Sequence, residues 1–144
     1  MRTYKPWAVL APLLFATALT FASDARAGDT SIALGEVAVP PASSGVDRAA
    51  LKAAAEGELR GVDTSRLRKH RDVVVSVAII GSAPSPYACT VNALLRDAKT
   101  GTMLAIIEGR ARAAGDANPE LRNQVIRAAL RSAVRQIPEA LAAN

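Results

Sequence analysis

The hydrophobic pattern is clearest in the segment Asp72–Gly81, where side chains alternate with a period of two. One side of this segment carries only aliphatic residues: Val73, Val75, Val77 and Ile79. The other side is also mostly apolar: Val74, Ser76, Ala78 and Ile80. This alternation predicts a β-strand, and apolar residues on both sides favour a central position in a sheet.

The same period predicts two further strands. Tyr87–Arg96 has one apolar side and one polar side: Cys89, Val91, Ala93 and Leu95 against Thr90, Asn92 and Arg96. Thr102–Ala113 separates into two sets: Met103, Ala105, Ile107, Gly109 and Ala111 on one face, and Leu104, Ile106, Glu108, Arg110 and Arg112 on the other. The small residues of the first set leave room for a helix to approach. The connections Ser82–Pro86 and Asp97–Gly101 have the composition of chain reversals, so we expect an antiparallel meander.

Two amphipathic helices are predicted from a period near 3.6. In the first, Ser44 and Asp47 have the spacing of an N-terminal cap, and Gly61 is a stop signal. Its apolar face recurs at i, i+4, i+8 and i+11: Leu51, Ala55, Leu59 and Val62. The second begins with Asn118 as cap and Pro119 in the first helical position, and extends to about Gln136. Its apolar face is broad: Val125, Ile126, Ala129, Leu130, Ala133, Val134 and Ile137. We expect Pro138 to end or kink this helix and Leu141 to pack loosely.

A fourth strand is predicted at Ser31–Val39, before the Pro40-Pro41 break. The order β-α-β-β-β-α then predicts an α+β two-layer sandwich, a mostly antiparallel sheet with two helices packed on one face. Because a strand-helix-strand connection is long enough for a crossover, the first strand can pair in parallel with one of the others.

The N-terminus has the three parts of a secretory signal peptide. Arg2 and Lys5 precede the uncharged run Ala8–Ala22, and Ala25-Arg26-Ala27 has the small residues that signal peptidase requires. We therefore assign 1–27 as the signal peptide, with cleavage between Ala27 and Gly28, and 28–144 as a single small α+β domain. This predicts export to the periplasm or the outside, with no stable membrane span after cleavage. An apolar N-terminal helix of the domain is the alternative.

Composition narrows the classes of function. Of the 18 basic and 13 acidic residues, three and one lie in 1–27, which leaves 15 and 12 and a net charge of +3. This small excess does not indicate a nucleic-acid partner. Tyr87 is the only aromatic residue after Ala27, so stacking sites for sugars or bases are not expected. Cys89 is the only cysteine, and its place on an apolar strand face favours a buried thiol, although a cross-link between two chains stays open.

The stretch Asn92–Leu104, followed by a strand ending in Glu108-Gly109 and an alanine-rich C-terminal helix, resembles exported accessory modules of bacterial envelopes. These modules form the curli-secretion-protein and TolB-N-terminal-like class, and Ile32–Pro40 with its helix is similar to their first unit. The chain departs from the class in three ways. It has no lipid-bearing cysteine and no following β-propeller. One helix, rather than a longer insertion, is predicted between the first two strands. The resemblance implies an envelope location and an architecture without catalytic residues.

Catalytic, cofactor-binding and metal sites are not predicted. His70 is the only histidine and lies far along the sequence from Cys89, so neither a zinc site nor a Cys-His pair has the required spacing. No nucleophile turn or glycine-rich phosphate loop is present. Glu36 and Glu108 lie within predicted strands, and a small hydrolase would need two carboxylates about 5 to 10 Å apart in one cleft. We therefore expect a protein that is not an enzyme and that carries no cofactor.

Two basic segments are the candidate interaction surfaces. They are the cluster Arg66, Arg68, Lys69 and Arg71 and the helical stripe Arg127, Arg131 and Arg135. For each segment, an ordinary solvated set of charges is the favoured interpretation. The favoured hypothesis is an exported, non-catalytic protein-interaction or structural module of the bacterial cell envelope with a protein partner. The alternative is a binder of anionic envelope polymers or lipids, and the oligomeric state is left open.

Overall fold

The computed structural model describes residues 30–41, 45–67, 70–116 and 118–144. The signal peptide predicted for 1–27 lies outside these residues. The elements follow in the order β1 (Ser31–Ala38), α1 (Arg48–Arg60), β2 (Asp72–Pro84), β3 (Tyr87–Asp97), β4 (Met103–Ala113), α2 (Pro119–Val134) and α3 (Ile137–Ala142). The predicted α+β class and element order are confirmed, with the short α3 as an addition.

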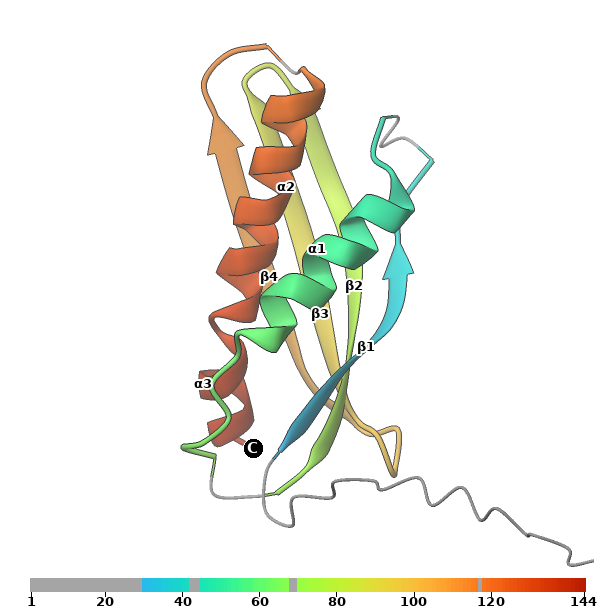
Figure 1. Ribbon diagram of the computed structural model, residues 1–144, viewed down its shortest axis with the longest axis vertical. Helices are drawn as coiled ribbons and strands as arrows, with labels where there is room; N and C mark the ends of the chain where they lie inside the picture. Colours follow the sequence, from blue (N-terminus) through green and yellow to red (C-terminus); the bar gives the residue numbers. More distant parts are fainter. Residues whose placement is uncertain (1–29, 42–44, 68–69, 117) are drawn as a thin grey trace, which may run out of the picture.

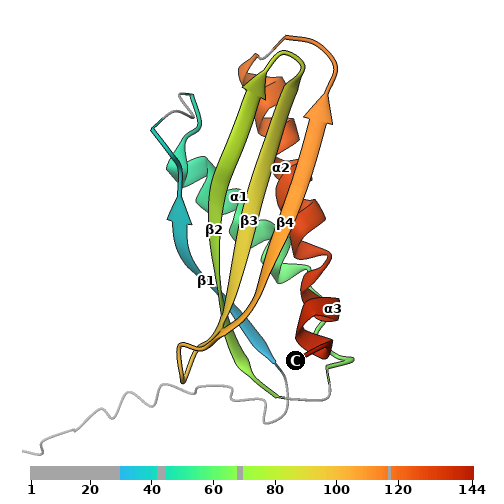
Figure 2. The same ribbon diagram turned by 180° about the vertical axis from the view of Figure 1, so that it is seen from behind.

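The four strands form one sheet in the order β1-β2-β3-β4. β1 pairs in parallel with β2, while β2-β3 and β3-β4 are antiparallel, as the crossover and the two short connections predicted. All three helices lie on one side of this sheet (Figure 1). α2 packs along β3 and β4, whereas α1 contacts β1 and α2. Seen from behind, none of the described helices lies over the other side of the sheet (Figure 2).

The core lies between the sheet and the helices. The predicted inward sets of β2 and β3 are all buried there, as is the whole predicted apolar face of α2. Gly109 of β4 allows the closest approach of the two layers, because a Cβ at this position would lie 2.1 Å from the carbonyl oxygen of Ala129 and 2.9 Å from Cβ of Ala133. The sequence expectation that small residues of β4 make room for a helix is therefore confirmed.

Side-chain caps stabilise the starts of α1 and α2. Asp47 accepts a hydrogen bond from the backbone N–H of Ala49, and Asn118 accepts one from Leu121. The Asn118 prediction is confirmed. For α1 the cap is Asp47, and the Ser44 part of the prediction lies outside the described residues. Val62 follows the end of α1 and is half-buried against the core.

The C-terminal prediction was wrong for Leu141. α2 ends at Val134, and α3 begins at Ile137 with Pro138 in its first turn. Because proline has no N–H for the carbonyl four residues earlier, the break falls just before Pro138. At this break the side-chain amide of Gln136 donates a hydrogen bond to the backbone oxygen of Ser132 at 2.9 Å. α3 then folds back on the core, and Leu141 is only 8% exposed.

Two irregular register positions also differ from the sequence prediction. Leu95 pairs with Ala105 but Arg96 pairs with Met103, so one residue is skipped and Met103 changes to the face of Arg96, where it is 54% exposed. In β2 the register shifts between Ile79 and Gly81. The ladder then resumes to Pro84, so the predicted loop Ser82–Pro86 shortens to the turn Ser85-Pro86.

Candidate interaction surface

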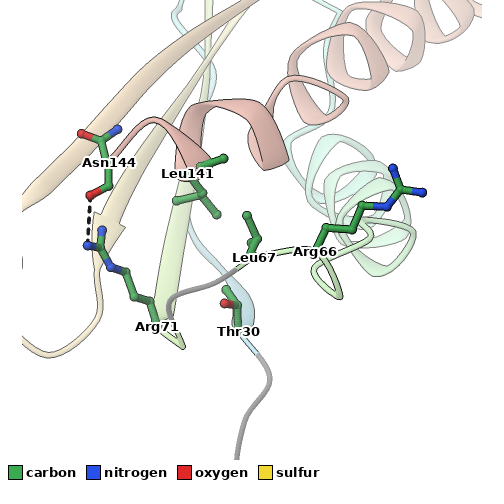
Figure 3. Close-up of a pocket in the computed structure, with 7 residues that line it drawn as sticks. Thr30, Arg66, Leu67, Arg71, Leu141 and Asn144 are labelled. Atoms are coloured by element: carbon green, nitrogen blue, oxygen red, sulfur yellow. Dashed lines mark hydrogen bonds between the residues drawn. The ribbon is translucent and has the colours of Figure 1, made fainter.

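The first predicted basic segment borders a hollow at one end of the molecule. Arg66 and Arg71 line a cavity of about 290 Å³ together with Thr30, Leu67, Leu141, Ala142 and Asn144. The guanidinium of Arg71 donates to the backbone oxygen of Asn144 at 3.3 Å. Figure 3 shows Arg66 and Arg71 on opposite sides of Leu67 and Leu141, so these two cations do not converge on one point. Arg68 and Lys69 lie outside the described residues.

The second basic segment faces α1. Arg131 donates to both carboxylate oxygens of Glu58, at 3.0 and 3.3 Å, and this hydrogen bonding raises the pKa of the guanidinium. Arg131 therefore helps to join α1 to α2. Arg127 and Arg135 are exposed and border two different hollows between these helices. Of the described residues of the two basic segments, Arg66 and Arg71 line neither of the hollows beside Arg127 and Arg135.

The titratable groups of the described residues are scattered. Among them no cluster of histidine, cysteine and carboxylate side chains could hold a metal ion. Cys89 is buried, and its desolvation raises the pKa of the thiol to about 11. Such a thiol is protonated at neutral pH and is a poor nucleophile. Glu108 is paired with Arg110 on β4, whereas Glu36 lies on β1. These strands are the two edges of the sheet, about 14 Å apart by the usual strand spacing.

One side of the sheet faces away from the described helices, and we call it the open face. Cross-strand pairing defines its rows. One row joins Ala33, Val74, Arg96 and Met103, the next joins Ser76, Leu94 and Ile106, and a third joins Ala38, Ala78, Asn92 and Glu108. Further along, Thr90 pairs with Arg110. The open face thus carries small and aliphatic side chains together with the polar Asn92 and the charged Arg96 and Glu108.

Exposure of large apolar side chains is concentrated on this surface. Among the described residues three such side chains are strongly exposed, namely Ile80 at 50%, Met103 at 54% and Ile106 at 60%. Ile80 is the residue skipped in the β2 register, and the other two lie on β4. Contiguous exposed apolar surface rimmed by charge marks interaction sites in proteins. Asn92, in the middle of the face, has a shielded Oδ1 without a hydrogen-bond partner among the described residues.

Sequence reasoning did not single out the open face. The signal was present in Val74, Ala78 and Ile80, which make the second side of β2 apolar. That pattern predicted the central position of β2 in the sheet, and the position is confirmed. A covering layer does not follow from it, because both helices of the predicted sandwich pack on the opposite side.

Known structures share this fold. The hypothetical protein CT253 from Chlamydia trachomatis is 12% identical, with a TM-score of 0.54 over 81% of this chain and 100% of that one. The PelC dodecamer from Paraburkholderia phytofirmans is 13% identical, with a TM-score of 0.51 over 75% of this chain and 87% of that one. No protein-family model and no curated protein matches the sequence. At these identities the likeness is one of fold alone, and the finer resemblance to the curli-secretion and TolB class stays a prediction.

Among the described residues no helix is both long enough and apolar enough to span a membrane.

Proposed function

We propose that this protein is an exported, non-catalytic interaction or structural module of the bacterial cell envelope, and that the open face is its contact surface. The observation that carries the proposal is the exposure of Ile80, Met103 and Ile106 on one uncovered side of a four-stranded sheet. Burying apolar surface stabilises a protein or complex by about 25 cal/mol per Å², and these exposed side chains do not yet contribute that free energy. A protein partner that covers the face recovers this free energy.

The distribution of reactive groups supports a role without catalysis. Glu36 and Glu108 lie on opposite edges of the sheet, farther apart than the carboxylate pair of a glycoside hydrolase. The thiol of Cys89 is buried and protonated at neutral pH. These positions give neither the two carboxylates nor the thiol the arrangement that such catalysis needs.

The envelope location is supported by the charged, apolar and small-residue parts of the sequence before Gly28. The PelC dodecamer, which has the same fold, supports a role in which copies of such a domain assemble. The mild positive charge of the chain after residue 27 is compatible with contact to anionic envelope components.

A photo-reactive amino acid at a single position tests the proposal in cells. The full chain is expressed with the cross-linker in place of Ile106 on the open face, or in place of Ala53, an exposed residue of α1. α1 lies on the other side of the sheet (Figure 2). We expect envelope fractions to contain a discrete cross-linked product for position 106 and none for position 53. Equal products at both positions, or none at position 106, would contradict the assignment of the surface. Recovery of the chain in the cytosol with residues 1–27 intact would contradict export.

The hollow beside Arg66 supports a second candidate function, binding of anionic envelope polymers or lipids. Arg66 is exposed beside apolar Leu67 and half-buried Arg71, a combination suited to an anion with an apolar portion. Retention on anionic polymer should then weaken steeply as salt rises, since exposed charges are screened. It should also weaken for Arg66→Ala more than for Arg112→Ala, which removes an equally charged residue from β4. Retention that is absent or insensitive to salt removes this candidate.

A further inference from the structure

The open face has the size of a stable protein interface. Four strands spaced about 4.8 Å apart, with up to about 11 residues at about 3.3 Å each, give a projected area of about 600 Å² once the shorter β1 is allowed for. Two such faces bury about 1,200 Å², which is at the lower end of the range for specific protein complexes. A contact of a face with an identical face therefore reaches the needed area without any other surface.

We propose that the open face packs on the same face of a second copy of this chain, related by a twofold axis. This inference rests on the proposed function and names the partner of that surface. In sheet-on-sheet packing two faces stack about 10 Å apart with strands nearly aligned, and the inward side chains interdigitate. The small residues Ala33, Ser76 and Ala78 lie on the same face as the larger Leu94 and Ile106. A face that alternates in this way is complementary to itself.

Charges at the two margins of the face favour one orientation. At the β1 margin Glu36 is exposed, and Asp72, the first residue of β2, accepts a hydrogen bond from the hydroxyl of Ser31 on β1. At the β4 margin Arg110 and Arg112 outnumber the one acid, Glu108, which is paired with Arg110, and Arg96 lies on the neighbouring β3. With the axis parallel to the strands, β1 of one copy lies over β4 of the other, so Glu36 faces a strand with an excess of arginine over acid. With the axis across the strands β4 lies over β4, which brings like charges together and costs free energy.

The edges of the sheet are less suited than the face to joining two copies. Strand addition needs free N–H and C=O groups along an edge. On β4 the side chain of Gln136 already donates to the backbone oxygen of Glu108 at 3.2 Å. β1 is short and is interrupted by a register shift between Leu34 and Val37. Charged side chains on β4 also disfavour the addition of another strand at this edge: Glu108, Arg110 and Arg112.

Sedimentation equilibrium of the purified full chain, in whatever processed form the bacterial host yields, measures the association. We expect a reversible dimer, and a dissociation constant at least about tenfold higher for Ile106→Glu, because a carboxylate is placed in the apolar contact opposite Glu36. Ala53→Glu makes the same charge change on the exposed side of α1 and should leave the constant unchanged. Since Ile106 is 60% exposed, both variants should keep the circular dichroism spectrum and melting behaviour of the parent.

Cross-linking by a short bismaleimide provides a second measurement that does not depend on a destabilising change. Ala78→Cys lies near the expected axis and should give a covalent dimer, whereas Met103→Cys at the β4 margin and Ala53→Cys on α1 should not. The native thiol of Cys89 is buried and does not compete. A dimer through Met103→Cys but not Ala78→Cys overturns the proposed orientation.

Three results would overturn the inference, and they bear differently on the proposed function. In the first, the chain is monomeric at every concentration, but cells show a cross-linked product through position 106 that contains a different protein. This result contradicts the dimer and leaves the open face as an interaction site. In the second, the chain is monomeric and cells show no cross-linked product through position 106, which contradicts both the dimer and the open face as an interaction site. In the third, the chain dimerises but Ile106→Glu leaves the dissociation constant unchanged, which means that the dimer forms through another surface.

Discussion

Gly109 sets the distance between β4 and α2. Its missing side chain lets the backbone of α2 approach so closely that an added Cβ would meet backbone atoms of Ala129 and Ala133 at 2.1 and 2.6 Å. Neither contact can be relieved by rotating a side chain. The sequence indicated this packing through the small residues of β4, and the structure places the tightest point at a single residue.

Gly109→Ala should therefore destabilise the protein by about 1 to 3 kcal/mol or more, the usual cost of overpacking a core. Gly57→Ala is the matched control, since a Cβ there would meet nothing within 4 Å. Gly57 lies inside α1, so alanine should stabilise the protein by about 0.5 to 1 kcal/mol. Denaturant unfolding of both variants measures the two signs, and a neutral Gly109→Ala would contradict the described contact between β4 and α2.

At the scale of elements, Asp97 organises the turn between β3 and β4. Its carboxylate accepts hydrogen bonds from the backbone N–H groups of Lys99 and Thr100, at 2.9 and 3.0 Å, while Gly101 supplies a φ of +70°. The hydrogen bonds, that from Thr100 first, lower the pKa of the Asp97 carboxyl group. The folded state therefore holds its proton less tightly than the unfolded state.

This lowered pKa predicts how stability depends on pH. The contribution of Asp97 is present above the ordinary carboxyl value near 3.8 and is lost as pH falls through the lower value of the folded state. Asp97→Ala should reduce the melting temperature by a few degrees at pH 7, and the difference from the parent should shrink in strong acid. Lys99→Ala keeps the backbone N–H and serves as control. A difference that stays constant with pH would rule out the carboxylate as its source.

Local patterns predicted most of the elements, because alternation and the caps at Asp47 and Asn118 act within a few residues. The exceptions depend on contacts between elements. Met103 changes face because the β3-β4 register skips a residue, and the sequence of β4 alone carries no mark of that skip. The burial of Leu141 likewise depends on α3 folding back on the core after the break before Pro138.

At the scale of the whole molecule, the decisive property is that one side of the sheet is covered and the other is not (Figures 1 and 2). Of the basic residues predicted as surfaces, those that the structure describes border separate hollows, and Arg131 is paired with Glu58. The apolar residues that remain exposed belong instead to the open face. The sequence could not assign them, since an apolar side of a strand is equally compatible with a second layer of the same chain and with a partner.

Two pairs of neighbouring isoleucines allow this claim to be tested directly. Ile79 and Ile107 point into the core, whereas Ile80 and Ile106 lie on the open face. The measurement is paramagnetic relaxation of the isoleucine methyl groups by a soluble agent, followed from dilute to concentrated protein. We predict strong relaxation of Ile80 and Ile106 in dilute protein and protection on association, with Ile79 and Ile107 protected throughout. Ile80 and Ile106 protected in a monomer, or still accessible in a dimer, would contradict the account.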